Sequence, residues 1–171
     1  ELQLLSRPDQ VSFEYPKGSR ILLTDDASTR ANALAKTFEE AGLQVELIHI
    51  GKNGKKAEGS ETPASNAKEY RLSEINDQSV QSLMETVLTE GAPVVAFVHL
   101  ERAHNGRGKQ AIEIDEKNAD TLKSVFLMAR HLKQPLADAA AHTRPAFLTV
   151  TQIDGQFGLN GNPSSDPYPG G

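Results

Sequence analysis

A polar turn, Thr24-Asp25-Asp26-Ala27-Ser28-Thr29-Arg30, follows the first apolar run of this 171-residue chain. A dinucleotide site needs glycines at such a turn, because the pyrophosphate must approach the backbone at a helix N-terminus. No glycine lies between residues 21 and 41. The carboxylates of Asp25 and Asp26 would also repel an anion that the helix dipole attracts. We therefore expect Asp26 or Ser28 to cap a helix there, and no nicotinamide cofactor to bind.

The Asp25-Asp26 pair also fits the chemistry of a phosphorylated signalling receiver. Such a domain needs a third acidic residue at the end of its middle strand and a lysine at the end of its last strand. Here His99-Leu100 ends the middle apolar run and Thr151-Gln152 ends the last one. Two of the required groups are missing, so the sequence argues against a receiver.

Three other catalytic or binding motifs are incomplete. Gly54-Lys55-Lys56 hints at a phosphate-binding loop, but the glycine five residues earlier and the Ser or Thr after the lysine are missing. His99 and His104 are five residues apart, whereas a helical zinc pair needs a spacing of four. No Gly-x-Ser-x-Gly elbow occurs, which leaves a serine hydrolase of the open-sheet type without support.

Carbonyl reduction by the short-chain dehydrogenase route needs a tyrosine with a lysine four residues further on, since the lysine helps the tyrosine act as an acid. The three tyrosines are Tyr15, Tyr70 and Tyr168, and none has a lysine at that spacing. The sequence therefore offers no catalytic, cofactor-binding or metal-ligating residue.

Composition excludes further classes of protein. The chain has no cysteine, so a disulfide scaffold, a thiolate metal site and cysteine catalysis are excluded. No apolar run approaches the roughly 18 residues of a membrane helix, and Arg7, Asp9 and Glu14 interrupt any signal-like stretch near the start. A net charge of -5, with six Phe, three Tyr and no Trp, argues against nucleic acid as the main partner. We expect a cytoplasmic protein that binds neither membranes nor nucleic acid.

Segments with strand-like runs of apolar residues alternate along the chain with segments in which apolar residues recur at helical spacing. Together they predict the elements that would position any site. Apolar runs predict strands at Arg20–Asp25, Gln44–Ile50, Val94–Leu100 and Ala146–Thr151, with a shorter one near Glu69–Leu72. Helical spacing predicts helices at Ala31–Ala41, at Val80–Leu88 after a cap at Asn76 or Asp77, and along the stripe Leu122, Val125, Phe126, Ala129 and Leu132. Pro135 should kink or divide the last helix before Leu136–His142. This alternation predicts an α/β fold, with an open parallel sheet and helices on both faces.

Three segments fall outside this pattern. Residues 51–68 contain no Val, Ile, Leu, Met, Phe, Trp or Tyr, which predicts a flexible surface excursion that adds nothing to a core. Residues 155–171 hold five glycines and three prolines, which predicts a tail without a long regular element. Residues 10–15 alternate and could add an edge strand.

Several segments together resemble the ketoreductase regions of multidomain synthases. Val94–Leu100 is similar to the short-chain dehydrogenase strand that runs into a His-Ala-Ala-Gly turn, which here reads His99-Leu100-Glu101-Arg102. The helix through Ala119–Phe126 sits where that fold places its long central helix. Phe147–Leu159 (FLTVTQIDGQFGL) resembles the last strand and Gly-x-Phe-Gly turn of modular ketoreductases. The resemblance spans roughly residues 10–162 and leans toward polyunsaturated fatty acid synthases over polyketide synthases.

The resemblance implies a truncated Rossmann-like, non-catalytic structural subdomain over residues 1–154, with residues 155–171 leading to a downstream catalytic subdomain. In that family the downstream subdomain binds NADPH and reduces a β-ketoacyl group carried on an acyl carrier protein. The family's catalytic serine lies in a strand that here reads Thr149-Val150-Thr151, so no functional residue carries over. The expected partner is that catalytic subdomain, with the carrier protein an indirect one, and this chain itself is expected to bind no cofactor.

Two alternatives remain open. A divergent stand-alone short-chain dehydrogenase would need Thr151 and Tyr168 as acid groups, although their spacing is wrong and the cofactor loop is absent. A small-molecule or partner-binding module would use the same sheet edge, but the sequence has no fixed polar constellation that favours one.

Overall fold

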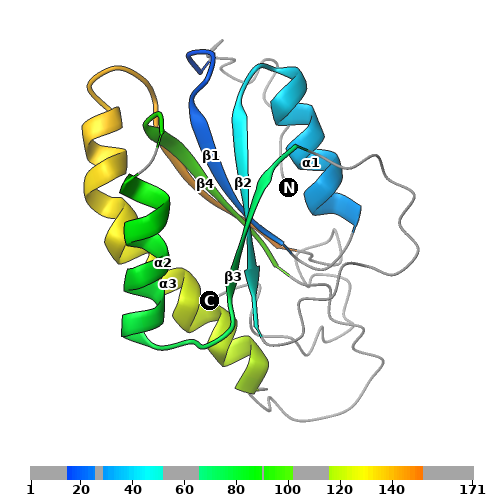
Figure 1. The fold of residues 1–171 in the computed structure, drawn as a ribbon, viewed down its shortest axis with the longest axis vertical. Helices are drawn as coiled ribbons and strands as arrows, with labels where there is room; N and C mark the ends of the chain where they lie inside the picture. Colours follow the sequence, from blue (N-terminus) through cyan, green and yellow to red (C-terminus); the bar gives the residue numbers. More distant parts are fainter. Residues whose placement is uncertain (1–14, 26–28, 52–65, 90, 102–115, 152–171) are drawn as a thin grey trace, which may run out of the picture.

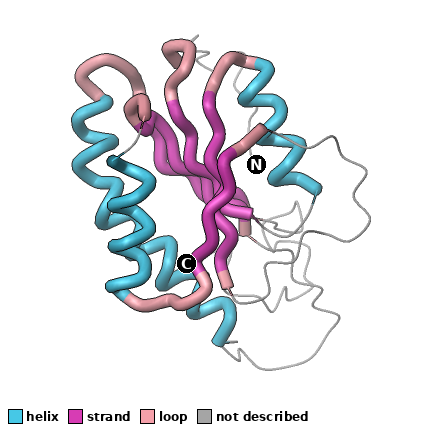
Figure 2. The backbone as a smooth tube through the Cα atoms, viewed as in Figure 1, coloured by secondary structure: helices cyan, strands magenta, loops and turns pink. Residues whose placement is uncertain are grey.

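The computed structural model describes residues 15–25, 29–51, 66–89, 91–101 and 116–151. In chain order, their elements are β1 (Arg20–Asp25), α1 (Thr29–Glu40), β2 (Gln44–Ile50), β3 (Lys68–Leu72), α2 (Asp77–Thr89), β4 (Val94–Leu100), α3 (Glu116–Ala139) and β5 (Ala146–Val150). The five strands form one parallel sheet in the order β3-β2-β1-β4-β5. Helix α1 covers one face of this sheet, and α2 and α3 cover the other (Figure 1, Figure 2).

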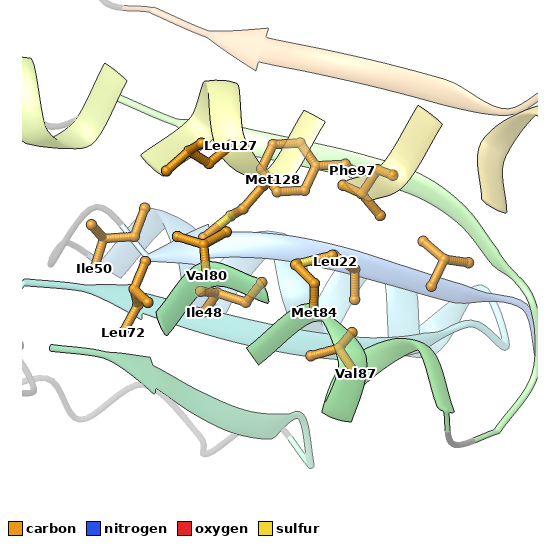
Figure 3. Packing of buried hydrophobic residues seen from close by; sticks show 12 residues of the cluster. Leu22, Ile48, Ile50, Leu72, Val80, Met84, Val87, Phe97, Leu127 and Met128 are labelled. Atoms are coloured by element: carbon orange, nitrogen blue, oxygen red, sulfur yellow. The ribbon is translucent and has the colours of Figure 1, made fainter. Parts of the chain in front are cut away.

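The predicted fold class is confirmed, and the central strands explain why. All seven residues of β4 are buried, as expected for a parallel strand that helices cover on both faces. Successive strand residues point to opposite faces and feed two separate cores. The larger core, drawn in Figure 3, joins strand residues such as Leu22, Ile48 and Phe97 to Met84 of α2 and Met128 of α3.

The second core lies between the sheet and α1. Strand residues such as Leu23, Leu47 and Val98 pack there against the helix. Ala31 and Ala35 are the buried residues of α1, and their small side chains let the helix backbone lie close to the sheet.

Two helix ends show regular capping, and the cap of α2 is one of the two residues predicted for it. Helix α1 ends in a Schellman turn, in which the Leu43 N–H donates to the Phe38 carbonyl at 3.0 Å and Gly42 takes a φ of 83°. Asn76 is the cap of α2, because its side-chain oxygen accepts from the Ser79 N–H at 2.8 Å.

Of the two effects predicted for Pro135, a kink or a division, the division is wrong, and so is part of the predicted apolar face. Helix α3 runs undivided through Pro135, and the Ala140 N–H still bonds to the Leu136 carbonyl at 3.1 Å beyond the proline. A proline removes one backbone donor but its fixed φ suits a helix, and little more than one turn remains after it here. The predicted apolar face is also wrong in part, since Leu122 and Phe126 are 41% and 71% exposed.

The side of α3 that meets the core is a neighbouring stripe. Ser124, Leu127, Met128 and Leu132 are the buried members of that stripe. The helix therefore carries two apolar stripes, and only one of them can face the sheet.

Several predicted segments lie wholly or mostly outside the described residues. These are the strand at residues 10–15, most of the excursion at residues 51–68, and the tail at residues 155–171. Tyr15 is described and lies outside any strand. Ala67 packs against the α1-side core, so the end of the 51–68 segment does contribute to a core.

Within the described ranges, no helix is long and apolar enough to cross a membrane.

A buried arginine ties four segments together at the amino edge of the sheet. Nη1 of Arg20 lies 2.9 Å from Oε1 of Glu46 on β2 and donates at 2.8 Å to the carbonyl of Val87 in the last turn of α2. Its Nε donates to the Ala92 carbonyl in the turn before β4. Gly91 lies in the same turn with a φ of +85°, a backbone conformation that favours glycine, and a Cβ there would only reach ordinary contact with the Arg20 side chain. Arg20 and Glu46 are 3% and 6% exposed.

Replacing Arg20 by Met should lower the free energy of unfolding by about 3–5 kcal/mol, because the Glu46 carboxylate would stay buried without its cation. The Arg20→Met/Glu46→Leu double variant should regain most of that loss, since it removes both charges together. Urea unfolding measures both values. The matched control is Lys36→Met, which breaks the exposed 3.8 Å pair with Glu40 and should change the value by less than about 0.5 kcal/mol. Equal losses in Arg20→Met and Lys36→Met would contradict this account.

Candidate functional site

The order of the strands reverses between β1 and β4. Strands β2 and β3 follow on one side of β1, and β4 and β5 lie on the other. Open parallel sheets bind ligands beyond the carboxyl ends of the strands at such a reversal. The candidate site is therefore the edge where Thr24 and Asp25 end β1, and where His99 and Leu100 end β4.

Thr24 and His99 bridge this reversal on the α2–α3 face. Oγ1 of Thr24 lies 2.8 Å from Nδ1 of His99, and the same oxygen accepts the Leu100 N–H at 2.9 Å. The Thr24 hydroxyl is thus able to donate to Nδ1, which would leave the proton of a neutral His99 on Nε2. Thr24 and His99 are 0% and 3% exposed, so the contact lies inside the protein.

Burial lowers the pKa of His99 from 6.5 to about 4. The imidazole is therefore neutral at physiological pH and carries no positive charge toward the carboxyl edge. A cofactor phosphate placed there would gain no ion pair from it.

A second polar group lies on the α1 face of the same edge. Nδ1 of His49 on β2 lies 2.7 Å from Oδ2 of Asp25, and its Nε2 lies 3.5 Å from Oε2 of Glu69 on β3. The two ring nitrogens point to two different carboxylates, so the three groups do not converge on one point. In keeping with this, no group of three His, Asp or Glu residues within the described ranges is placed to hold a metal ion.

Two contacts of Glu101 join the end of β4 to α1 and to β5. Nη2 of Arg30, in the first turn of α1, lies 3.5 Å from the Glu101 carbonyl just beyond β4. The Glu101 N–H donates at 3.0 Å to the Val150 carbonyl at the end of β5. Thr149, in the strand segment that corresponds to the one holding the family's catalytic serine, is exposed on β5 and pairs in register with His99.

The structure brings together some of the residues that the sequence singled out and not others. Asp25 and His99 both lie at the carboxyl edge, but on opposite faces of the sheet. Asp26, Ser28, His104 and the Gly54-Lys55-Lys56 segment fall outside the described residues, as do Gln152 and Tyr168. His49 also belongs to this edge although no sequence motif singles it out; its one signal is a histidine inside the apolar strand Gln44–Ile50.

The low pKa of His99 makes stability depend on pH. Between about pH 6.5 and 4 the unfolded chain binds a proton that the folded chain does not, so stability falls as the pH falls through this window. From pH 7 to 4 we expect His99 to account for a loss of about 3 kcal/mol.

The His99→Gln variant tests this, because it should be less stable at pH 7 but have a shallower pH dependence in urea unfolding. The control replaces exposed His142 by Gln and should leave the His99-dependent slope in place. An unchanged slope in His99→Gln would contradict the assignment.

Comparison with known proteins finds similarity in structure only. No protein-family model matches the chain, and no curated protein matches it in sequence. Among solved structures, the 3-ketoacyl-(acyl-carrier-protein) reductase of Brucella melitensis, complexed with NADH, matches at 22% identity and a TM-score of 0.59 over 80% of this chain and 58% of that one. An actinorhodin polyketide ketoreductase with NADPH matches at 16% identity and a TM-score of 0.58 over 88% and 58%. The Bacillus cereus enoyl-acyl carrier protein reductase with NADP+ matches at 16% identity and a TM-score of 0.57 over 84% and 58%.

At these identities the match concerns the fold. The chain spans 58% of the length of each of these three reductases. It has the Rossmann-like parallel sheet of short-chain reductases, including ketoacyl reductases.

Proposed function

We propose that this chain is a non-catalytic structural subdomain of the ketoreductase region of a cytoplasmic polyunsaturated fatty acid or polyketide synthase. Its role is to support a separate catalytic subdomain, which uses NADPH to reduce β-ketoacyl groups held on an acyl carrier protein. The observation that carries the proposal is a reductase-like fold in which the chain's own contacts occupy the described carboxyl edge at the strand reversal.

Two contacts support this interpretation. The Thr24–His99 contact bridges the ends of β1 and β4, and the Arg30 side chain reaches from α1 to the Glu101 carbonyl. Of these groups, Arg30 lies in the first turn of α1, next to where a dinucleotide would need open backbone and helix-end amides. The turn between β1 and α1 contains no glycine that would allow such an approach.

Electrostatics support it as well. The carboxylates of Asp25 and Glu69 flank His49 at this edge, and His99 is neutral. Negative groups close to a phosphate would weaken the binding of a dinucleotide, because like charges repel each other, and most strongly where water is scarce. The edge therefore suits a protein that retains the fold for its shape and surface.

The test uses the full chain and the ketoreductase catalytic domain encoded in the same gene, produced separately. The chain alone, given NADPH and a β-ketoacyl thioester, should cause no loss of nicotinamide absorbance. Added in excess to the catalytic domain, it should raise that domain's Tm by about 5 °C or more through mass action. Serum albumin at the same concentration is the control and should give no rise. Turnover by the chain alone, a gene without such a domain, or an unchanged Tm would each contradict the proposal.

A further inference from the structure

Every exposed large hydrophobic residue of the described chain lies on α3 or β5. These residues are Leu122, Phe126, Phe147, Leu148 and Val150, which are 41%, 71%, 40%, 51% and 46% exposed. We call them the apolar edge surface. Their confinement to two consecutive elements sets them apart from scattered surface apolar residues, which need no explanation.

The apolar edge surface includes both faces of β5, which is an edge strand of the sheet formed by the described residues. Phe147 pairs in register with Phe97 and stacks on it, with ring centroids 4.7 Å apart, so it lies on the α2–α3 face. Leu148 pairs with Val98 of the α1-side core, so Leu148 and Val150 lie on the opposite face. Both faces of β5 are therefore exposed, although parallel strands are normally covered on both.

The other edge of the sheet provides an internal comparison. On β3, Lys68, Glu69 and Arg71 are exposed and charged, whereas Leu72 is buried. Charged side chains are a common protection of an edge strand against pairing with another chain. β5 has no charged residue at all. Of the two edges, β5 is the one whose chemistry suits an added strand.

Charge indicates what kind of partner fits. Residues 116–151 contain five basic and three acidic residues, whereas the other residues contain 13 basic and 20 acidic ones (18 minus 5 and 23 minus 3). Lys123, Lys133 and Arg144 are exposed on α3 or just before β5. Two copies of this surface would bring like charges together, which disfavours a dimer, while a partner with acidic residues around an apolar strand would be attracted.

We infer that the apolar edge surface docks an apolar edge strand, flanked by acidic residues, of the ketoreductase catalytic domain. This inference rests on the proposed function and names the face through which it operates. The docked strand would extend the sheet beyond β5 through backbone hydrogen bonds, and an adjoining helix would cover Leu122 and Phe126. The three reductases compared above are longer than this chain, which matches only 58% of each.

Two pairs of variants of the full chain test the surface by calorimetric titration with that catalytic domain. Phe126→Glu should weaken the Kd at least tenfold, while Ser82→Glu, which adds the same charge at an exposed position of α2, should change it less than twofold. Leu148→Glu should weaken the Kd as strongly, while Arg71→Glu on the other edge strand should not. Both apolar sites are exposed, so the variants should fold, and circular dichroism checks this.

Hydrogen exchange of residues 146–151 adds a readout specific to strand pairing. The backbone amides of β5 that point away from β4 should exchange at least tenfold more slowly in the complex. Binding that neither Phe126→Glu nor Leu148→Glu weakens would overturn the docking surface and leave the proposed function intact. No binding by the unaltered chain would overturn both. A dimer of the free chain that Phe126→Glu dissociates in sedimentation would make a second copy the occupant and overturn the inference.

Discussion

The buried guanidinium of Arg20 is the interaction on which the arrangement of the elements most depends. It connects β1 to Glu46 of β2, to the last turn of α2 and to the turn that begins β4. Helix ends have carbonyls without partners inside the helix, and this cation satisfies one of them at Val87. A desolvated ion pair gives little net stability, and we infer that this one helps to select which segments meet, because an arrangement that buries either charge alone would be costly. All of these contacts lie at the amino edge of the sheet.

The carboxyl edge, where reductases of this fold receive their cofactor, is therefore free to change without loss of that anchor. In this chain it is held by contacts between side chains, with a neutral His99 on one face and the Asp25–His49 pair on the other. Such contacts stabilise the ends of the strands but present no cation to a phosphate. These contacts, together with the retained sheet and both cores, agree with the proposed role, in which the chain acts through its surface. The apolar edge surface then has a physical role, since it is where the two cores reach solvent.

Much of this fold is predictable from sequence, because a parallel strand covered on both faces is a continuous apolar run. Val94–Leu100 is one, and it is wholly buried. The Arg20–Glu46 pair was not foreseen, since a single charge at or within an apolar run carries no mark of its partner 26 residues away. The buried stripe of α3 was misassigned in part because Phe126 and Leu127 are adjacent and both apolar. Only packing against α2 and β4 decides which of the two is buried. The contacts at the carboxyl edge likewise depend on strand order, which periodicity does not encode.

We propose that this reductase-like fold binds no cofactor at its carboxyl edge. Titration of NADPH into the isotope-labelled chain, followed through the amide resonances of Thr24, Asp25, His99 and Glu101, tests it most directly. The account predicts that these resonances stay unchanged up to millimolar cofactor. Saturable shifts of the same resonances with a micromolar Kd would contradict it and would make the Thr24–Arg30 turn a cofactor loop without glycine.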